Sequence, residues 1–461
     1  MASFLNRIHD RIAQEPTKIG LLQHFGTGNL GDDAAVDAIM QHIKDRWPCA
    51  VFVGLSLYPA DSERRHGIPC YPIRRGDFSP KHGQAAVKTS LGKKSIGRGF
   101  KDKLKAALDR CHLLSLVRPP KRLFEELLFL VKSFRLAKSL DILVVCGGGQ
   151  LLDDWGGPWA FPYTLFKWAL LAKLAGTKCY FVNLGAGPLN HPLSKWFVRR
   201  TLYSADYVTF RDDKSSALIH EIGFNGKAEV IADSVYGLKV PNVGTHDRRV
   251  RNGNDLVIAI SPMAYRDPRR YWDQDQAGYD RYINELADFC ARLIGDRHRL
   301  RLFGSDVWFD SQANIDLEAA IKERLAIDTS HWLTRESVKS IDELLSQLSE
   351  VDCLVTCKFH GVIFGQLLNV PILAIAHHSK VAKLMDDFRL AEYCVDIQTF
   401  NADVLTKMFE RLVANIRNIK ASVPEKVELY RRNLQTQFDN LFPSTDEPYC
   451  VREGRMTGSA R

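Results

Sequence analysis

The chain has 461 residues, of which 45% are hydrophobic and 25% are charged. This length exceeds one ordinary core and predicts two domains of about 200 residues each. The composition is that of a globular protein, and the lack of any stretch of 18 apolar residues excludes a membrane-spanning helix from the expected elements. The formal net charge of +9 favours anionic partners such as phosphorylated molecules, anionic membrane surfaces or nucleic acid.

The first half of the chain repeats a β-rich run, a glycine-rich turn and an amphipathic stretch. The predicted strands are 19–25, 142–146, 178–182, 207–210 and 229–231, and the predicted helices include 34–43 and 164–175. Strands that alternate with helices predict βαβ units and a parallel sheet. We therefore expect a Rossmann-like domain over 1–240, which carries a basic insertion over 80–138.

The second half of the chain repeats the same alternation after a break. Residues 240–254 are rich in Pro, Gly, Asn and charge, which predicts a linker. Strands are then expected at 256–260, 298–303, 353–356 and 370–375, with helices at 282–294, 341–348 and 362–368. This predicts a second Rossmann-like domain over 255–400, two helices over 401–442 and a disordered tail over 443–461. The fold class is α/β, with two parallel-sheet domains that face a cleft.

Four polar turns follow predicted strands, where ligands of open parallel sheets bind. They are residues 28–33, 147–154, 183–188 and 358–361. The first enters a helix, so its free N–H groups attract anions. Asn29, Asp32 and Asp33 there either bind a ligand or cap the helix.

The second turn contains three glycines followed by two carboxylates. Gly148 and Gly149 allow a ligand to approach the backbone closely, and Asp153 or Asp154 is a candidate base for a hydroxyl proton. The alternative for this turn is a tight bend with a helix cap.

Cationic residues end two other strands. Arg211 is suited to grip a carboxylate or phosphate with two parallel hydrogen bonds, although it could instead pair with Asp212. Lys358 offers a point charge to an anion, and His360 can hold or move a proton near neutral pH. A loop after residue 260 brings Tyr265 and Arg266 to the same edge, either to touch a second ligand or to form an ion pair.

Taken in order, these segments resemble the polysaccharide pyruvyl transferase family. The run Gly28-Asn29-Leu30-Gly31-Asp32 resembles the Gly-Asn-x-Gly-Asp start of that family, and residues 147–153 resemble its Gly-Gly-Gly-x-Leu-x-Asp turn. Residues 211–215 resemble its Arg-Asp-x-x-Ser motif, and residues 358–360 its Arg-Leu-His motif. The chain departs from the pattern at Lys358, where the family has Arg, and at Ser234, where the family has Pro.

The resemblance implies a fold similar to the GT-B glycosyltransferases, with phosphoenolpyruvate as donor and a saccharide, commonly lipid-linked, as acceptor. By position, His360, Asp153 and Asp154 are the candidate catalytic residues, and Arg211, Lys358 and Gly361 would bind the donor. The candidate acceptor-binding residues are Asn29, Asp32, Asp33, Gly148, Gly149, Tyr265 and Arg266. We expect a ketal product, no metal and no cofactor besides phosphoenolpyruvate as co-substrate.

Two other functions remain open from the sequence. One is a GT-B glycosyltransferase that uses a nucleotide sugar, and the other is a non-catalytic carbohydrate-binding member of the family. Nucleic acid is not expected as a partner, because the basic segment lacks interleaved aromatic residues.

The expected location is the cytoplasm. The 10 cysteines have no paired spacing, and the N-terminus has no apolar signal region. From Lys81 to Lys138 there are 15 Lys and Arg against 4 Asp and Glu, which is typical either of a solvated surface or of a patch for anionic lipid at the inner face of the membrane.

Overall fold

The computed structural model describes residues 16–23, 28–75, 113–154, 156–240, 255–269, 271, 273–307, 309–325 and 327–444, with residues 113–123 described by backbone alone. Residues 80–112 of the expected insertion, residues 241–254 of the expected linker and residues 445–461 of the expected tail lie outside this range. The predicted domain limits therefore stay predictions.

The first sheet has seven strands in the order β3-β2-β1-β4-β5-β6-β7, and every neighbouring pair is parallel. Its strands are β1 (Lys18–Leu22), β2 (Val51–Ser56), β3 (Cys70–Pro72), β4 (Ile142–Leu151), β5 (Lys178–Ala186), β6 (Tyr207–Phe210) and β7 (Glu229–Val230). Its helices are α2 (Leu30–Arg46), α3 (Pro59–His66), α5 (Leu113–Lys138), α6 (Phe161–Ala175), α7 (Pro192–Ser204) and α8 (Asp213–Glu221), with short turns η1 (Gly157–Trp159) and η2 (Ser234–Gly237).

The second sheet has six parallel strands in the order β10-β9-β8-β11-β12-β13. They are β8 (Val257–Ser261), β9 (Arg299–Leu302), β10 (Leu333–Arg335), β11 (Cys353–Thr356), β12 (Ile372–Ala376) and β13 (Cys394–Asp396). The helices are α9 (Gln276–Gly295), α10 (Asp310–Arg324), α11 (Ile341–Ser349), α12 (Phe359–Leu367) and α13 (Ser379–Asp387), with the turn η3 (Ala391–Tyr393). The predicted α/β class with two parallel sheets is confirmed.

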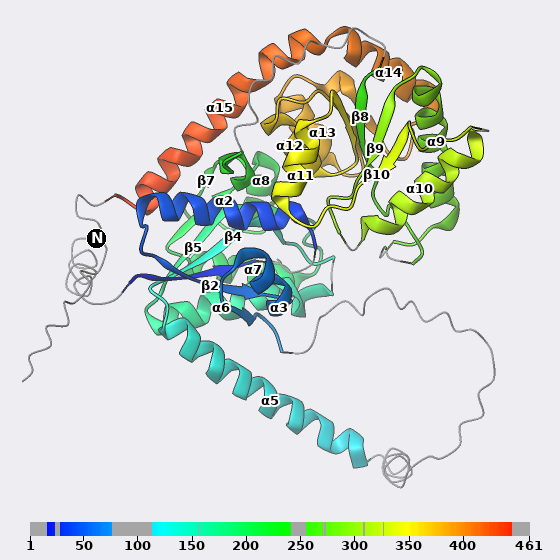
Figure 1. Cartoon of the computed structure of the whole chain (residues 1–461). Coiled ribbons are helices and arrows are strands. Elements are labelled where there is room, and N and C mark those ends of the chain that lie inside the picture. Colours follow the sequence, from blue (N-terminus) through cyan, green and yellow to red (C-terminus); the bar gives the residue numbers. More distant parts are fainter. Residues whose placement is uncertain are drawn as a thin grey trace, which may run out of the picture.

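The last two helices are α14 (Ala402–Ala414) and α15 (Ile416–Leu441), and α15 runs from the second sheet back to the first (Figure 1). Its end is anchored there, because Phe438 is fully buried against strands of the first sheet. Gln437 exchanges hydrogen bonds of 3.0–3.1 Å with Asn183, and Arg46 pairs with Asp439 at 2.7 Å. This helix therefore ties the two sheets into one body.

A second link joins the domains beside the first predicted turn. Leu30 N–H donates to the Ser305 carbonyl at 2.9 Å, and Val307 N–H donates to the Gly28 carbonyl at 2.8 Å. This backbone pairing brings the start of α2 against the loop after β9. The carboxyl ends of the strands of both sheets consequently face each other, as open parallel sheets require for a shared ligand site.

The glycine run 147–149 is part of a strand, whereas the sequence analysis placed it in a turn. β4 continues through it to Leu151 because its ladder with β5 resumes after a bulge, with Gly148 opposite Leu184 and Leu151 opposite Ala186. Gly148 has φ 82°, a conformation that favours glycine. The bulge lets a neighbouring carboxylate come close, as described below.

Candidate functional site

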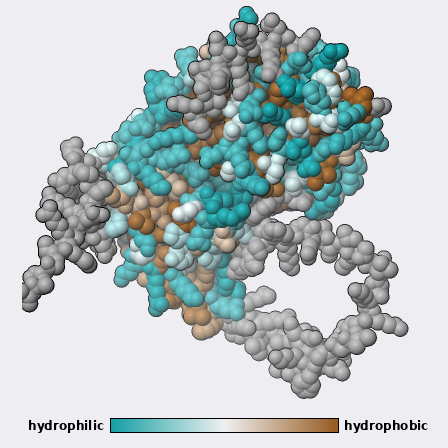
Figure 2. All heavy atoms as spheres, viewed as in Figure 1, coloured by the Kyte–Doolittle hydropathy of each residue, from teal (hydrophilic) through white to brown (hydrophobic). Residues whose placement is uncertain are grey.

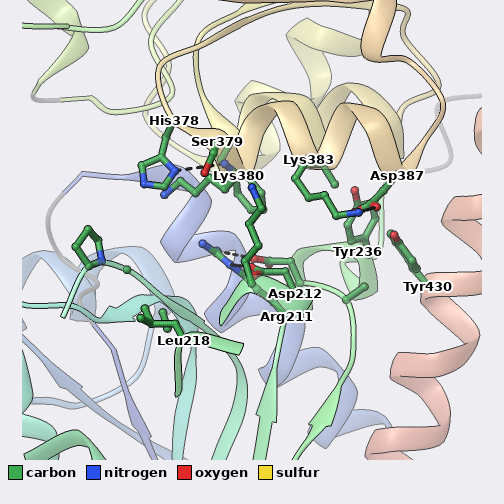
Figure 3. A pocket seen from close by; sticks show the side chains of 18 residues that line it. Arg211, Asp212, Leu218, Tyr236, His378, Ser379, Lys380, Lys383, Asp387 and Tyr430 are labelled. Atoms are coloured by element: carbon green, nitrogen blue, oxygen red, sulfur yellow. Dashed lines mark hydrogen bonds and ion pairs between the residues drawn. The ribbon is translucent and has the colours of Figure 1, made fainter. Parts of the chain in front are cut away.

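A pocket of about 230 Å³ lies between the carboxyl ends of the two sheets. The first domain contributes residues 186–188 after β5, Arg211 after β6 and Asp233 before η2. The second domain contributes Phe359 and residues 378–380 at the start of α13, and α15 adds Tyr430. Figure 3 shows these side chains converging from both domains.

Arg211 is held rigidly at the floor of this pocket. Its Nη1 donates to Asp233 Oδ2 at 2.9 Å, and its guanidinium lies 4.4 Å from the centre of the Phe359 ring. On the other side it packs on Gly185, where an added Cβ would overlap the guanidinium. Its Nε is buried and makes no hydrogen bond among the described residues, but it lies 3.6 Å from Asp212 Oδ2, so the alternative pairing with Asp212 is present as a longer ion pair. A fixed guanidinium is suited to a two-pronged contact with an anion.

Lys380 approaches Arg211 from the other domain. It lies in the first turn of α13, which His378 caps by accepting the Lys380 N–H at 3.3 Å, and Figure 3 shows its side chain pointing toward Arg211 and Asp212. Burial, then the charge of Arg211, lowers the pKa of Lys380 to about 8. Two cations and the positive end of a helix thus face one small space, which favours an anionic ligand.

His360 lies in the first turn of α12, beside Asp233. Its Nε2 is 3.9 Å from Asp233 Oδ2 and, within the described part of the chain, has no hydrogen-bond partner. Burial lowers the pKa of His360 to about 4, and although Asp233 opposes this shift, Arg211 and Lys380 add to it. The imidazole is therefore neutral at neutral pH until an anion arrives nearby.

Asp32 supplies a carboxyl group on the opposite side of the domain boundary. Asn29, the N-cap of α2, donates from Nδ2 to Asp32 Oδ2 at 2.8 Å. Burial, then the charge of Asp33, raises the pKa of Asp32 to about 7, while the nearby charges of Arg211 and Lys380 oppose this shift. Asp32 faces the β4 bulge, since a Cβ on Gly148 would lie 3.1 Å from Asp32 Oδ1.

These five side chains form one group, which we call the interdomain charge cluster: Asp32, Arg211, Asp233, His360 and Lys380. Each follows the carboxyl end of a strand, and the cluster borders the pocket through Arg211, Asp233 and Lys380. Asp32 follows β1 and His360 follows β11, which are the strands at which the order of each sheet reverses. Ligands of open parallel sheets bind at such reversal points.

Gly31 makes the approach of His360 possible, because a Cβ on Gly31 would overlap the imidazole ring. We expect Gly31→Ala to displace His360 and to lower kcat of the reaction proposed below by at least about 100-fold, since small misplacements of a positioned group cost that much. Gly295→Ala is the matched control, because its added Cβ would meet nothing within 4 Å. Equal kcat in the two variants would show that the contact has no role.

The raised pKa of Asp32 also predicts how stability depends on pH. Below a pH of about 3.8, Asp32 is protonated in both the folded and the unfolded state, and its contribution to the stability of the folded state is then fully present. This contribution is lost as the pH rises through the folded-state pKa of about 7. At pH 8, Asp32→Asn should therefore unfold at higher urea concentration, with a gain of about 2 kcal/mol, and its advantage should shrink at pH 4. The exposed Asp280→Asn serves as control; an identical gain at both pH values would contradict the prediction.

The predicted bases after the glycine run lie elsewhere. Asp153 accepts the backbone N–H groups of Asn190 and His191 at 2.8–3.1 Å, and although burial opposes it, these bonds lower the pKa of Asp153. Asp154 is exposed, and neither carboxylate lines the pocket. The contacts of Asp153 brace the loop before α7 and give no support to a role as base.

Lys358 does not line the pocket either. Its Nζ lies 3.0 Å from Oδ1 of the buried Asp310, and burial raises the pKa of that carboxyl to about 6 even though Lys358 opposes the shift. Gly361 is buried one turn into the helix, where an added Cβ would overlap Thr356. Both residues shape the junction of β11 and α12.

The remaining predicted acceptor residues are scattered. Tyr265 is buried and packs edge-on against Tyr271 and Tyr282, and Arg266 pairs with Asp275 at 3.1 Å. Asp33 faces α3, with His66 Nε2 at 3.5 Å and Arg65 Nη1 at 3.6 Å. Gly149 lies near Arg211, with 3.9 Å from an added Cβ to Nη2. Of the predicted set, Arg211, His360 and Asp32 belong to the interdomain charge cluster, and Asn29, Gly148 and Gly149 lie beside its members.

Sequence reasoning missed Lys380 as a site residue. The signal was available, because the run His377-His378-Ser379-Lys380 follows the predicted strand 370–375, as the other polar turns follow theirs. Asp233, which directly precedes the departure from the family pattern at Ser234, was not predicted as a site residue, yet it joins Arg211 to the surroundings of His360.

Comparisons with known proteins agree on family and fold. A family model described as polysaccharide pyruvyl transferase matches residues 29–379, and no curated protein matches the chain. A candidate UDP-N-acetylglucosamine 2-epimerase from Listeria monocytogenes has a TM-score of 0.55 at 10% identity, covering 94% of this chain and 99% of its own.

Two further solved structures show the same likeness. The UDP-GlcNAc 2-epimerase from Methanocaldococcus jannaschii has a TM-score of 0.51 at 11% identity, covering 87% of this chain and 93% of its own. The N-terminal domain of trehalose-6-phosphate phosphatase from Candida albicans has a TM-score of 0.51 at 11% identity, covering 94% and 98%. At such identities the likeness shows the fold alone, and the expected GT-B-like arrangement is confirmed.

Proposed function

Because the chain belongs to the polysaccharide pyruvyl transferase family, a family of transferases, we propose that it moves the pyruvyl group of phosphoenolpyruvate onto hydroxyl groups of a saccharide, commonly a lipid-linked one, to form a ketal. The observation that carries this proposal is that Arg211 and Lys380 face one small pocket from opposite domains, with Lys214 and Lys383 also in its lining. Phosphoenolpyruvate is small and carries two anionic groups, a phosphate and a carboxylate, which suit a pocket lined by several cations.

The contacts of each cation suggest how the donor is held. Arg211 Nη1 donates to Asp233, whereas Nε makes no hydrogen bond and lies 3.6 Å from Asp212 Oδ2. An anion that displaces Asp212 from this edge could make a two-pronged contact with the guanidinium. Lys380 adds a point charge beside the N-terminus of α13. A bound anion would offset the repulsion between these two cations, a term of the kind that often dominates catalysis.

The separated pKa values of Asp32 and His360 suggest the acid and the base. With a pKa of about 7, Asp32 holds a proton near neutral pH and gives it to the methylene carbon of phosphoenolpyruvate, which leaves the adjacent carbon cationic. A sugar hydroxyl attacks that carbon and gives its proton to the neutral His360. His360 then protonates the departing phosphate as the C–O bond to it breaks. A second hydroxyl closes the ketal and returns a proton to Asp32.

This sequence balances and restores both groups. Two protons enter, one at the methylene carbon and one at the phosphate, and two leave from the sugar hydroxyls. Negative charge on the donor also raises the pKa of His360 while the donor is bound, which favours its transient protonation. No metal is needed for these steps.

The test is a transfer assay with phosphoenolpyruvate and a panel of saccharides, in which released phosphate and pyruvylated product are both measured. We expect phosphate release only with an acceptor that gains a pyruvyl ketal. Phosphoenolpyruvate that is neither bound nor consumed, together with turnover of a nucleotide sugar, would replace this proposal by the glycosyltransferase function.

Two lysine variants separate donor binding from structural support. We expect Lys380→Met to raise the KM for phosphoenolpyruvate by about 100-fold, because it removes the buried cation that approaches Arg211 in the pocket. Lys358→Met should instead lower stability by about 3 kcal/mol at neutral pH, because it leaves the buried Asp310 without its partner. Measurements of the KM for phosphoenolpyruvate and of urea unfolding check both expectations. A raised KM in Lys358→Met together with a lowered stability in Lys380→Met would indicate that Lys358 binds the donor.

A further inference from the structure

The helices on one face of the first domain expose an unusual number of large apolar side chains. On α5 these are Phe124, Leu127, Leu128 and Val131, which are 44–60% exposed. They are spaced at i, i+3, i+4 and i+7, so they form one stripe along the helix. Figure 1 shows α5 extending away from the body of the molecule, and Figure 2 shows hydrophobic residues gathered in that lower region.

The opposite side of α5 accounts for its attachment to the domain. Glu125 pairs with Arg75, and Lys167 of α6 lies 4.4 Å from the centre of the Phe129 ring. Ser133 and Ala137 are buried further along the same side. The helix is therefore fixed by one face, and its apolar stripe is left without a described partner.

The neighbouring helices extend the apolar surface. Leu170 and Leu174 of α6 are 38% and 66% exposed and share a helix face with Lys167, the residue that contacts α5. Beyond them lie Trp159, which is 65% exposed in η1, and Trp196, which is 39% exposed in α7. Ring contacts of each with Phe197 connect these two tryptophans. Exposed apolar surface on this scale marks a binding face.

The charges around this surface are mostly positive. The stripe of α5 continues along the same face into Arg135 and Lys138, whereas Lys132, seven residues after Glu125, lies on the side of the helix that carries this carboxylate; all three cations are exposed. α6 and α7 contain no Asp or Glu, and they add Lys173, Lys195, Arg199 and Arg200. The acidic residues described on α5, Glu125 and Glu126, point to the attached side, where Arg75 contacts both.

We propose that this face, the α5–α7 surface, docks the protein on a lipid bilayer that contains anionic head groups. Apolar and aromatic side chains flanked by lysine and arginine are the composition of helices that lie in a membrane interface. Long cationic side chains can keep their charges at the head groups while their stems cover apolar surface. Over the described residues, no helix is long and apolar enough to cross the bilayer, so the contact is peripheral.

The positive charge of the α5–α7 surface also favours an anionic bilayer over two other binding partners, a second copy of the chain and the segment 76–112. A second copy of the chain would bring the same cations against one another across a symmetric interface, which is unfavourable. The segment 76–112 of this chain is itself basic, with nine Lys and Arg against three Asp, so it would meet like charge as well. An anionic lipid surface satisfies both the apolar and the charged parts, and this inference stands whether or not the transfer reaction does.

The test is co-sedimentation of the full chain with phosphatidylcholine vesicles that contain or lack phosphatidylglycerol. We expect binding to the anionic vesicles, weakened at least 10-fold by raising the salt from about 0.1 to 0.5 M. The double variant Leu127→Ser/Leu128→Ser should bind at least about 10-fold more weakly. The triple variant Lys132→Gln/Arg135→Gln/Lys138→Gln should bind about 100-fold more weakly at low salt.

Matched variants on the second domain act as controls. Ile327→Ser removes an apolar side chain that is 57% exposed, and Lys407→Gln/Arg411→Gln/Arg417→Gln removes three exposed cations. Both should bind vesicles as the native chain does, and thermal unfolding should show that all variants fold. The proposal would be overturned if the native chain did not bind anionic vesicles, or if the control variants lost binding equally. It would also be overturned if sedimentation velocity showed a dimer that Leu127→Ser/Leu128→Ser dissociates.

Discussion

Replacing Arg211 by lysine is expected to lower kcat/KM for phosphoenolpyruvate by about 1000-fold. The variant keeps a positive charge, and it also keeps a partner for the buried Asp233. It loses the planar group that stacks between Gly185 and Phe359, and it loses the Nε donor. Removing one preorganised donor from a water-excluded site costs 10²–10³ in rate, and loss of orientation adds to this.

The control for Arg211 is a cation of the same type outside the site. Arg301 pairs with Glu350 on the surface at 2.7 Å, so Arg301→Lys should leave kcat/KM within about twofold of the native value. Steady-state kinetics with varied phosphoenolpyruvate make the measurement. If Arg211→Lys retained near-native kinetics, charge alone would suffice and the two-pronged contact would be wrong.

Replacing His360 by glutamine is the second change from which we expect a large effect, a loss of about 1000-fold in kcat. Glutamine keeps a polar side chain at the contact with Gly31 but cannot accept and release a proton as imidazole does. The pKa of about 4 in the empty site means that the native imidazole starts neutral, which suits a group that first accepts a proton. The loss should therefore appear in kcat more than in KM.

The nearby His377 offers a matched control. Its Nδ1 lies 2.7 Å from the Cys357 carbonyl, its pKa is likewise lowered by burial, to about 3, and it lies outside the interdomain charge cluster. His377→Gln should lower kcat by less than about 10-fold. A His360→Gln variant with near-native kcat, or equal losses in the two variants, would remove His360 from the reaction.

The fold was largely predictable because both periodicities are strong in this chain. Buried parallel strands such as 353–356 and 372–376 are continuous apolar runs, and each is followed by a polar turn. The sheet edge formed by β2, α3 and β3 was not predicted. Its helix, Pro59–His66, is short and almost wholly polar, and β3 has three residues, so neither gives a periodic signal.

The site was only partly predictable, because its residues come together through tertiary contacts. The rule that ligands lie at the carboxyl ends of strands led to Arg211, His360 and Asp32, which the structure brings together. It could not separate these from Asp153, whose carboxylate accepts hydrogen bonds from two backbone N–H groups of a loop 37 and 38 residues away. Nor could it show that Lys358 would meet Asp310, since that pairing depends on where α10 packs.

The residues that pack against two of the glycines could not be predicted from the sequence. Gly31 leaves room for His360 from the other domain, and Gly185 leaves room for Arg211 from a neighbouring strand. Both are contacts between segments far apart in the chain. We predicted close approach only at Gly148 and Gly149, and the roles of Gly31 and Gly185 emerged only with the packing of the two sheets.

The most direct test of the central claim is calorimetric titration of the protein with phosphoenolpyruvate, with uridine diphosphate as the comparison ligand. We predict that phosphoenolpyruvate binds at one site per chain, that binding takes up protons because the donor anion raises the pKa values of His360 and Asp32, and that Arg211→Lys abolishes it. Binding of uridine diphosphate by the native chain, with no heat from phosphoenolpyruvate, would contradict the claim.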